Sequence, residues 1–329
     1  MNEYFFQSTG MYHAATGFYI RHWHAIGPEE RHGFIQIMTA PSANTAPANT
    51  GTAGNREYIF TTTDFDRLRD RIGSHSGISL SDSKLDLVYG RLAKRLRARG
   101  LTRFSDYCEL LESGDRDELE HFVNALTTNL TSFFREKHHF DHLRDETSKH
   151  LLNRIKGGNP VRIWSAGCST GEEPYSIAMT LAESIPGIEN HDIRILATDL
   201  ETNVVTHAAN GVYDTSVIEG LPDEKMYRWF QKGSGKHEGF IRTSATLRKL
   251  IAFRPLNLMG NWPMTGQFDV VFCRNVVIYF DKSTQRVLFN RFADTMQPNG
   301  TLFIGHSETL HNVSDRFASV GKTIYRKTS

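Results

Sequence analysis

The chain has 329 residues, of which 39% are hydrophobic and 23% are charged. At roughly 150 residues per domain, this length allows about two domains that fold without disulfides or metals. The 38 basic and 37 acidic side chains nearly cancel, which excludes a disordered polyelectrolyte and a strongly basic nucleic-acid coat protein.

Cysteine spacing and the lack of long apolar runs indicate a protein of the reducing cytosol. Cys108, Cys168 and Cys273 are odd in number, widely spaced and without a C-x-x-C pair, which argues against a disulfide framework and a cysteine zinc site. No apolar run approaches the roughly 18 residues of a membrane span, and the N-terminus lacks a secretory signal pattern. We expect a soluble, cytoplasmic protein with no metal and no membrane insertion.

Residues 1–55 have the composition of an extension and a linker. Residues 39–55 contain only Thr, Ala, Pro, Ser, Asn and Gly, which cannot bury enough apolar area to offset the entropy of ordering. The residues before them are rich in aromatics and histidines without a clear period, and Met38 is a hypothetical alternative start. We expect residues 1–55 to be a disordered or non-native extension.

Residues 56–150 are predicted to form a small all-α domain, because apolar residues recur three and four apart and glycines are few. One helix is expected to begin near Ser81 or Asp82 and to end at Gly100. Its buried stripe would consist of Leu85, Val88, Leu92 and Leu96. Its other faces carry the cations Arg91, Lys94, Arg95, Arg97 and Arg99. These cations fit either a solvated face or a docking surface for an acidic partner.

Residues 151–329 change to short apolar runs that alternate with amphipathic stretches, which is typical of an α/β fold. The expected strands lie in VRIWSAG, IRILATDL, FDVVFCRNVVIYF and TLFIGHSE. We predict a doubly wound, mostly parallel Rossmann-like sheet, in which ligands bind beyond the carboxyl ends of the strands. Glycines and short alternating runs at about residues 211–253 predict a small antiparallel β insert.

Glycines and acidic residues follow the first two predicted strands. The first turn contains Gly167, Ser169 and Gly171 and runs into Glu172, but it is neither a P-loop nor a clean G-x-G-x-x-G motif. Glu172 could complement the helix dipole or accept a hydrogen bond from a ligand. Asp199 ends the second strand, where nucleotide-binding folds place a carboxylate that holds ribose hydroxyls; it could also cap the next helix.

Arg274 and Asn275 come at the end of the apolar run FDVVFC, where buried polar groups need partners. Internal hydrogen bonds or a ligand could satisfy them. The region lacks a D/N-P-P-Y-like loop, the feature expected of enzymes that methylate exocyclic amines of bases. We therefore expect no nucleic-acid partner.

From about Phe65 to the C-terminus, the chain resembles the CheR family of chemotaxis receptor methyltransferases. The resemblance is carried by ALTTNLTSFFRE, WSAGCSTGEEPYSIA, ATDL, LNLM, FDVVFCRNVVIYFDK and GHSE. It implies a protein-glutamate O-methyltransferase in which a helical receptor-recognition domain precedes the methyltransferase domain. S-adenosyl-L-methionine would be the methyl donor and S-adenosyl-L-homocysteine the product.

The resemblance also implies a cofactor site between the helical domain and the sheet. The residues that would bind the cofactor are Asn129, Thr131, Arg135, Glu172, Asp199, Asn257, Leu258, Arg274 and Asn275. The alternative for the TNLT-x-x-FR stretch is a helix whose apolar residues pack while its polar residues face water. One departure from some relatives is Gly167-Cys168, where they have alanines.

The implied reaction needs no general base. A glutamate carboxylate, with a reference pKa near 4.3, is already ionised at neutral pH and can attack a sulfonium methyl directly. The enzyme would only align and desolvate the reactants, and alignment can contribute on the order of 7–11 kcal/mol. We therefore interpret His306 of GHSE as a structural strand-end histidine and not as a base.

By the same resemblance, methyl-accepting chemotaxis receptors would be the partners. Their acidic methylation helices would meet Arg91, Lys94, Arg95 and Arg99. A receptor's C-terminal pentapeptide would add as an edge strand at the loop that contains Gly233, Gly235 and Gly239, although an ordinary hairpin turn is the alternative. Two other functions stay open, a methyltransferase for another carboxylate and a non-catalytic sensor of S-adenosylmethionine. We expect a monomer.

Overall fold

The computed structural model describes residues 56–328, and the extension expected over residues 1–55 lies outside them. Within the described range, one cluster of buried apolar side chains runs from Phe65 to Leu126 and another from Phe133 to Ile324. A helical core is therefore followed by a core built on a sheet. This confirms the predicted order of an all-α part and an α/β part. The second core begins earlier than the boundary expected after residue 150, because Phe133, Phe140 and Leu143 pack in it.

The helical part begins with a well-capped helix and contains the predicted amphipathic one. Its elements are α3 (Thr62–Ser76), the 3₁₀ turn η1 (Asp82–Lys84), α4 (Leu85–Arg99), α5 (Phe104–Glu112) and α6 (Arg116–Leu126). At the start of α3, Thr61 and Asp64 form a reciprocal capping box. Helix α4 ends at Gly100 in a left-handed conformation, as predicted, and Val88, Leu92 and Leu96 are fully buried.

A buried carboxylate, Glu118 of α6, connects α4, α5 and α6. Its side chain is 1% exposed. It accepts hydrogen bonds from Arg95 Nε and Nη2 at 3.0 and 2.7 Å and from the Tyr107 hydroxyl at 2.8 Å. Burial alone would raise the pKa of Glu118, but the hydrogen bonds from Arg95 and Tyr107 and the charge of Arg99 outweigh it and lower the pKa. The ionised carboxylate is thus a structural centre of this core.

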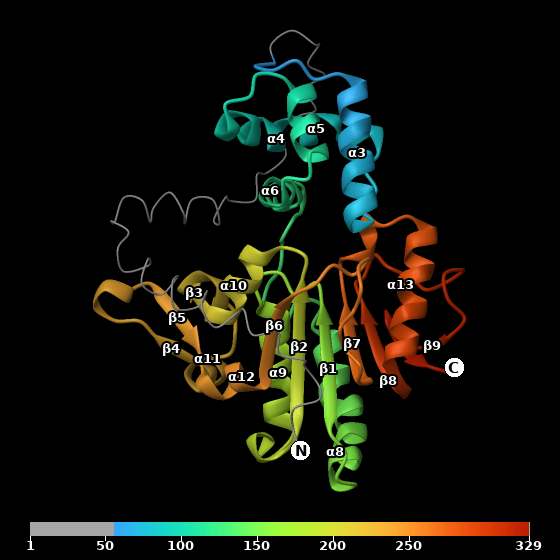
Figure 1. Ribbon diagram of the computed structural model, residues 1–329. Helices are drawn as coiled ribbons and strands as arrows, with labels where there is room; N and C mark the ends of the chain where they lie inside the picture. The colour runs from blue at the N-terminus through green and yellow to red at the C-terminus, as the bar shows by residue number, and fades with distance from the viewer. Residues whose placement is uncertain (1–55, 329) are drawn as a thin grey trace. The chain divides into compact units, whose positions relative to one another are not determined.

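The second part contains a seven-stranded sheet with the order β6-β2-β1-β7-β8-β10-β9 (Figure 1). The strands β1 (Val161–Ala166), β2 (Ile193–Asp199), β6 (Ile251–Pro255), β7 (Phe268–Cys273) and β8 (Met296–Ile304) are parallel. The strands β9 (Phe317–Gly321) and β10 (Ile324–Lys327) continue the sheet in antiparallel pairing. The predicted mostly parallel, doubly wound sheet is confirmed. The turns after the parallel strands consequently meet at one edge.

Helices cover both faces of this sheet. Since neighbouring residues of a strand point to opposite faces, Ile163 of β1 packs in the cluster that includes Ile177 of α9, whereas Trp164 contacts Phe292 of α13 with ring centroids 5.2 Å apart. The helical elements are α7 (His138–His142), the π-helical turn η2 (Leu143–Thr147), α8 (Ser148–Lys156), α9 (Glu172–Ser184), η3 (Ile188–Asn190), α10 (Thr202–Asn210), α12 (Ala245–Leu250), η6 (Val277–Tyr279) and α13 (Lys282–Thr295).

A small antiparallel sheet with the order β3-β5-β4 interrupts the α/β order, as predicted (Figure 1). Its strands are β3 (Val212–Asp214), β4 (Phe230–Lys232) and β5 (Phe240–Thr243). The connections between them contain η4 (Thr215–Ile218), α11 (Asp223–Trp229) and η5 (Gly235–His237). Trp229, Phe230 and Ile241 are buried in the main core. Strand β4 pairs with β5 on one side and is an edge strand of the described sheet.

Across residues 56–328, no helix combines the length and the apolar character that crossing a membrane would require.

Replacing Arg95 with Ala should lower the free energy of unfolding by about 3 kcal/mol, because Glu118 would lose the main partner of its buried charge. Lys94→Ala is the matched control on the same helix: Lys94 is exposed and has no ion pair with the described residues, so its loss should cost less than about 0.5 kcal/mol. Denaturant unfolding followed by circular dichroism measures both. Superimposable transitions of the two variants would contradict this role of Arg95.

Candidate functional site

The turn after β1 approaches its neighbours so closely that two positions require glycine. Gly167 has a φ of 89°, and a Cβ atom there would lie 2.3 Å from Val276 Cγ2. Gly171 has a φ of 103°, and a Cβ atom there would lie 2.7 Å from the Cβ atom of Ala208. The Gly167 amide also donates to the Thr198 carbonyl at 2.8 Å. The missing side chains therefore let this turn pack against β2, the segment after β7 and α10.

Asp199, at the end of β2, joins this turn to the next one. Its Oδ2 accepts a hydrogen bond from the Ser169 amide at 2.8 Å, and its Oδ1 accepts one from the Glu201 amide at 3.1 Å. Burial raises the pKa of Asp199, although the backbone amides oppose this effect. Helix α10 begins at Thr202 with Glu201 as its N-cap, so Asp199 is not the cap of this helix.

Three carboxylates near the turns after β1 and β2, those of Glu172, Asp199 and Glu201, lack a cation partner among the described residues. Glu172 and Glu201 are buried, and Asp199 is half-buried. Thr170 donates to Glu172 Oε2 at 2.7 Å. None of the three forms an ion pair within residues 56–328, and burial raises the pKa of each carboxyl group. This edge of the sheet consequently concentrates acceptors and negative charge that a cationic, hydroxyl-bearing ligand would match.

The segment between α6 and α7 contacts these strand ends. The Asn129 carbonyl accepts a hydrogen bond from Ser169 Oγ at 3.2 Å, and Asn129 Nδ2 donates to Glu201 Oε2 at 2.5 Å. Thr127 Oγ1 donates to the same Glu201 oxygen at 3.0 Å. Glu201 was not predicted as a site residue. The available signal was its position two residues after Asp199, at the same strand end.

Residues 127–137 do not form a helix, so the helical alternative for the TNLT-x-x-FR stretch is wrong. Phe134 is left-handed, with a φ of 53°, and its amide donates to Ser176 Oγ at 2.9 Å. Leu130 is 78% exposed instead of packing. Arg135 Nη1 donates to the Leu130 carbonyl at 2.7 Å, and Thr131 is half-buried.

Arg274, one of the predicted residues, has a side chain that is 2% exposed and lies in an internal ion-pair network. Its Nη1 donates to Glu173 Oε2 at 2.9 Å, and its Nη2 lies 3.3 Å from Glu136 Oε2. Burial raises the pKa of Glu136, but the hydrogen bond from His306 and the charge of Arg274 outweigh it and lower the pKa to about 2. Glu136 and Glu173 were missed, although each is the last acidic residue of a quoted motif, FFRE or GEE.

The ends of β7 and β8 are joined through Glu308 of the GHSE motif. Its carboxylate accepts hydrogen bonds from the Asn275 amide at 3.1 Å and from the Gly305 amide at 2.5 Å. Asn275 is left-handed, with a φ of 59°. His306 is 64% exposed, and its Nδ1 lies 3.0 Å from Glu136 Oε1. The carboxylate of Glu308 thus fixes the backbone that carries Asn275.

Asn257 and Leu258 lie after β6, at a contact with the helical part. Asn257 Nδ2 donates to the carbonyl of His75 in α3 at 2.6 Å, and its Oδ1 accepts a hydrogen bond from the Met259 amide at 2.9 Å. Leu258 is buried. The structure therefore brings Asn129, Asp199 and Glu172 together, and it places Asn257 beside α3.

The cations of α4 that were predicted to dock an acidic receptor helix differ in whether they already have a partner within the helical part. Arg91 Nη1 donates to backbone carbonyls at the end of α6 at 2.8 Å, Arg95 holds Glu118, and Arg99 pairs with Asp115 at 2.6 Å. Lys94 is exposed and has no ion pair within the described part of the chain.

The three glycines of the insert that were predicted to meet a pentapeptide, Gly233, Gly235 and Gly239, are also unlike one another. A Cβ atom at Gly233 would lie 2.0 Å from the His237 carbonyl oxygen, whereas nothing lies within 4 Å of such an atom at Gly235 or Gly239. Close packing therefore requires a glycine at position 233, whereas Gly235 and Gly239 have open surroundings and positive φ angles of 58° and 84°.

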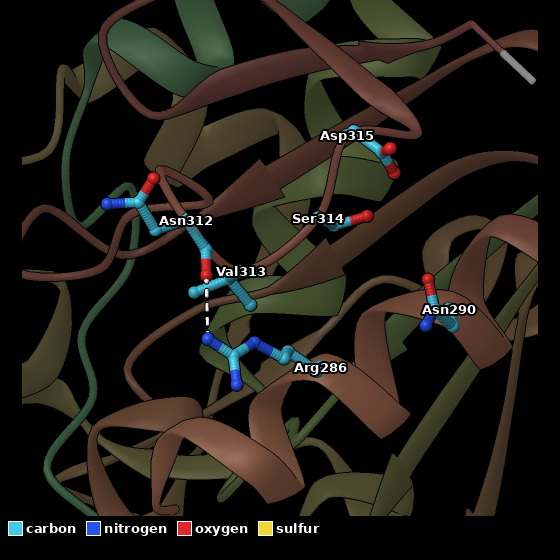
Figure 2. A pocket seen from close by; sticks show the side chains of 6 residues that line it. All are labelled: Arg286, Asn290, Asn312, Val313, Ser314 and Asp315. Carbon is cyan, nitrogen blue, oxygen red and sulfur yellow. Dashed lines mark hydrogen bonds between the residues drawn. The ribbon is translucent and has the colours of Figure 1, made fainter.

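A surface hollow of about 350 Å³ lies away from these residues, between α13 and the loop before β9 (Figure 2). Arg286 donates to the Asn312 carbonyl across it at 3.2 Å. No predicted site residue lines it.

Comparisons with known proteins agree with this arrangement. The family profile described as CheR methyltransferase, SAM binding domain, matches residues 129–326, and the one described as CheR methyltransferase, all-alpha domain, matches residues 63–127. Chemotaxis protein methyltransferase 2 of Pseudomonas aeruginosa is 44% identical over 273 residues, which cover 83% of this chain and 95% of that protein. The chemotaxis protein methyltransferase of Escherichia coli is 44% identical over 263 residues, which cover 79% and 89%. A probable chemotaxis protein methyltransferase of Rhizobium etli is 43% identical over 264 residues, which cover 78% and 97%.

Gly167→Ala should lower the free energy of unfolding by about 3 kcal/mol, because the new methyl group combines a left-handed backbone with an overlap against Val276. Gly158→Ala is the matched control, since its φ is 73° but nothing lies within 4 Å of the added atom. It should cost only about 1 kcal/mol of backbone strain. Equal losses in urea unfolding would show that the close approach at Gly167 is unimportant.

Proposed function

The chain belongs to the CheR methyltransferase family, and we propose that it transfers the methyl group of S-adenosylmethionine to glutamate side chains of chemotaxis receptors. The products would be glutamate methyl esters and S-adenosyl-L-homocysteine. The observation that supports this most is the group formed by the buried carboxylates of Glu172 and Glu201 and the half-buried carboxylate of Asp199, which have no cation partner among the described residues and lie near the turns after β1 and β2.

The residues present fit S-adenosylmethionine, which the domain over residues 129–326 binds. When bound, this group supplies a methyl group on an electrophilic sulfonium. Buried carboxylates match its positive groups and its ribose hydroxyls, and we assign the ribose to Asp199. The other proposed cofactor-binding residues are Asn129, Thr131, Arg135, Glu172, Asn257, Leu258, Arg274 and Asn275. Arg274 would act through its ion pairs, because its guanidinium is already paired with Glu173.

In the proposed reaction, the protein only has to position and desolvate a nucleophile that is already charged. A glutamate side chain is ionised at neutral pH, so no residue has to remove a proton from it. Holding the carboxylate in line with the methyl group, away from water, lowers the barrier. His306 is largely exposed and is held by Glu136, which suits a structural role better than that of a base.

Receptor docking would use the cationic face of α4. Lys94 is free to meet an acidic methylation helix, whereas Arg91, Arg95 and Arg99 already have partners in the helical part. Their positive charge still adds to the local potential that steers an acidic helix. Salt should weaken this steering.

Tethering of a receptor's C-terminal pentapeptide would use the small antiparallel sheet. Strand β4 has β5 on one side only among the described strands, so its other edge can accept an added strand. Gly233, at the end of this strand, packs against the His237 carbonyl and so shapes the loop beside the edge.

Methyl transfer is tested with the purified full chain, receptor-containing membranes and S-adenosylmethionine labelled in the methyl group. Label should enter the receptors and be released by base as methanol, and Asp199→Ala should reduce the rate about 100-fold or more. Asp192→Ala, at the opposite end of β2, should leave the rate unchanged. Label in another carboxylate, or binding of the cofactor without transfer, would instead support one of the two competing functions.

Tethering is tested by titrating a receptor's C-terminal pentapeptide into the protein by calorimetry. We expect saturable heat with the peptide and none with a scrambled peptide of the same composition, because only the right side chains fit the sites beside the added strand. Gly233→Ala should weaken binding, because its methyl group would displace the loop. No heat at millimolar concentrations of the native peptide would refute the tether.

A further inference from the structure

Four residues at the ends of β1 and β2 close a ring of hydrogen bonds. The two carboxylate oxygens of Asp199 accept from the amides of Glu201 and Ser169 at 3.1 and 2.8 Å. Ser169 Oγ donates to the Asn129 carbonyl at 3.2 Å, and Asn129 Nδ2 donates to Glu201 Oε2 at 2.5 Å. The ring thus joins the turn after β1, the turn after β2 and the segment that follows α6.

Glu201 is the member of this ring that also reaches α6 directly. Its Oε2 accepts a second hydrogen bond, at 3.0 Å, from Thr127, the C-cap residue of α6. Glu201 is 9% exposed, and the charged groups that face it, Asp199 and Glu120, are both acidic. Its carboxylate therefore depends on the neutral donors of Asn129 and Thr127. The Asn129 side chain in turn depends on Glu201, whereas the Thr127 hydroxyl also donates to the Asn124 carbonyl at 3.2 Å.

We propose that Glu201 is a positioning residue, which holds Asn129 and Thr127 in place and so sets the position of the segment after α6 against the cofactor site. This inference rests on the proposed function, in which Asn129 contacts S-adenosylmethionine. Residues 127–137 are irregular, so no helical hydrogen bonds fix Asn129. Its fixed geometry comes from the contacts to Glu201 and Ser169.

The same two helices share a second contact that offers a matched control. Thr202, at the start of α10, donates to Glu120 of α6 through an exposed hydrogen bond. Removing Glu120 breaks this contact between α6 and α10 and takes one negative charge away from Glu201, but it removes none of the hydrogen bonds among Asn129, Thr127 and Glu201. A general effect of loosening the two helices would appear in Glu120→Ala, whereas the proposed effect would not.

The test measures the affinity of the full chain for S-adenosylhomocysteine by calorimetry. Glu201→Ala should weaken binding about 10- to 100-fold, because the half-buried Asn129 amide loses its acceptor and Asn129 is released. Glu201→Gln should bind within about threefold of the wild type, since its amide oxygen can accept the same hydrogen bonds. Glu120→Ala should bind like the wild type. In steady-state assays, Glu201→Ala should raise the KM for S-adenosylmethionine more than it lowers kcat.

A double-mutant cycle with Asn129→Ala tests the route of the effect. If Glu201 acts through Asn129, the loss of affinity caused by Asn129→Ala should be much smaller in the Glu201→Ala background than in the wild type. Additive losses would overturn the proposal, as would wild-type affinity in Glu201→Ala. A wild-type chain that binds no S-adenosylhomocysteine would instead refute the proposed function itself.

If Glu201→Ala does not fold, hydrogen exchange measured on the wild-type protein tests the same proposal. Addition of S-adenosylhomocysteine should slow exchange in residues 127–131 together with residues 199–201, because the ring links them. Slowing confined to residues 199–201 would overturn the proposal.

Discussion

The constraint on which the site depends is that Glu172 and Glu201, which are buried, and Asp199, which is half-buried, have no cation partner among the described residues. Burying an ionised carboxylate is costly unless hydrogen bonds replace its water, so each of the three needs fixed donors. Those donors come from different segments: a turn after β1, a turn after β2 and the stretch after α6. The charge that remains uncompensated favours a ligand with positive groups, and the fixed donors hold the turns that would surround it.

The buried carboxylates at the ends of β7 and β8, on the other half of the same sheet edge, have different partners. At the ends of β7 and β8, Arg274 pairs with both Glu173 and Glu136, and Glu308 accepts hydrogen bonds from backbone amides. Removing one partner of a buried ion pair is costly, because the other charge is then left buried without a partner. One side of the edge thus holds a buried arginine between two of its carboxylates, whereas Glu172, Asp199 and Glu201 on the other side have no cation among the described residues.

Local patterns predicted much of the fold and part of the site. Apolar runs predicted the parallel strands, glycines predicted the end of α4 and the antiparallel insert, and the strand-end positions of Glu172 and Asp199 placed them together. Partnerships between distant segments could not be predicted in this way. The hydrogen bond from Asn129 to Glu201 spans 72 positions, and the one from Arg95 to Glu118 spans 23. Such contacts depend on how helices and turns pack within and between the two cores, and residue spacing in one segment does not predict them. For this reason the sequence did not indicate that Arg95 has an internal partner.

The most direct measurement is a crystal structure of the full chain with S-adenosylhomocysteine. The account predicts ligand density between the turn at residues 167–171 and the end of β2, with Asp199 on the ribose and Asn129 still joined to Glu201. Density elsewhere, for example in the hollow between α13 and the loop before β9, with residues 167–201 left unchanged and ligand-free, would contradict it.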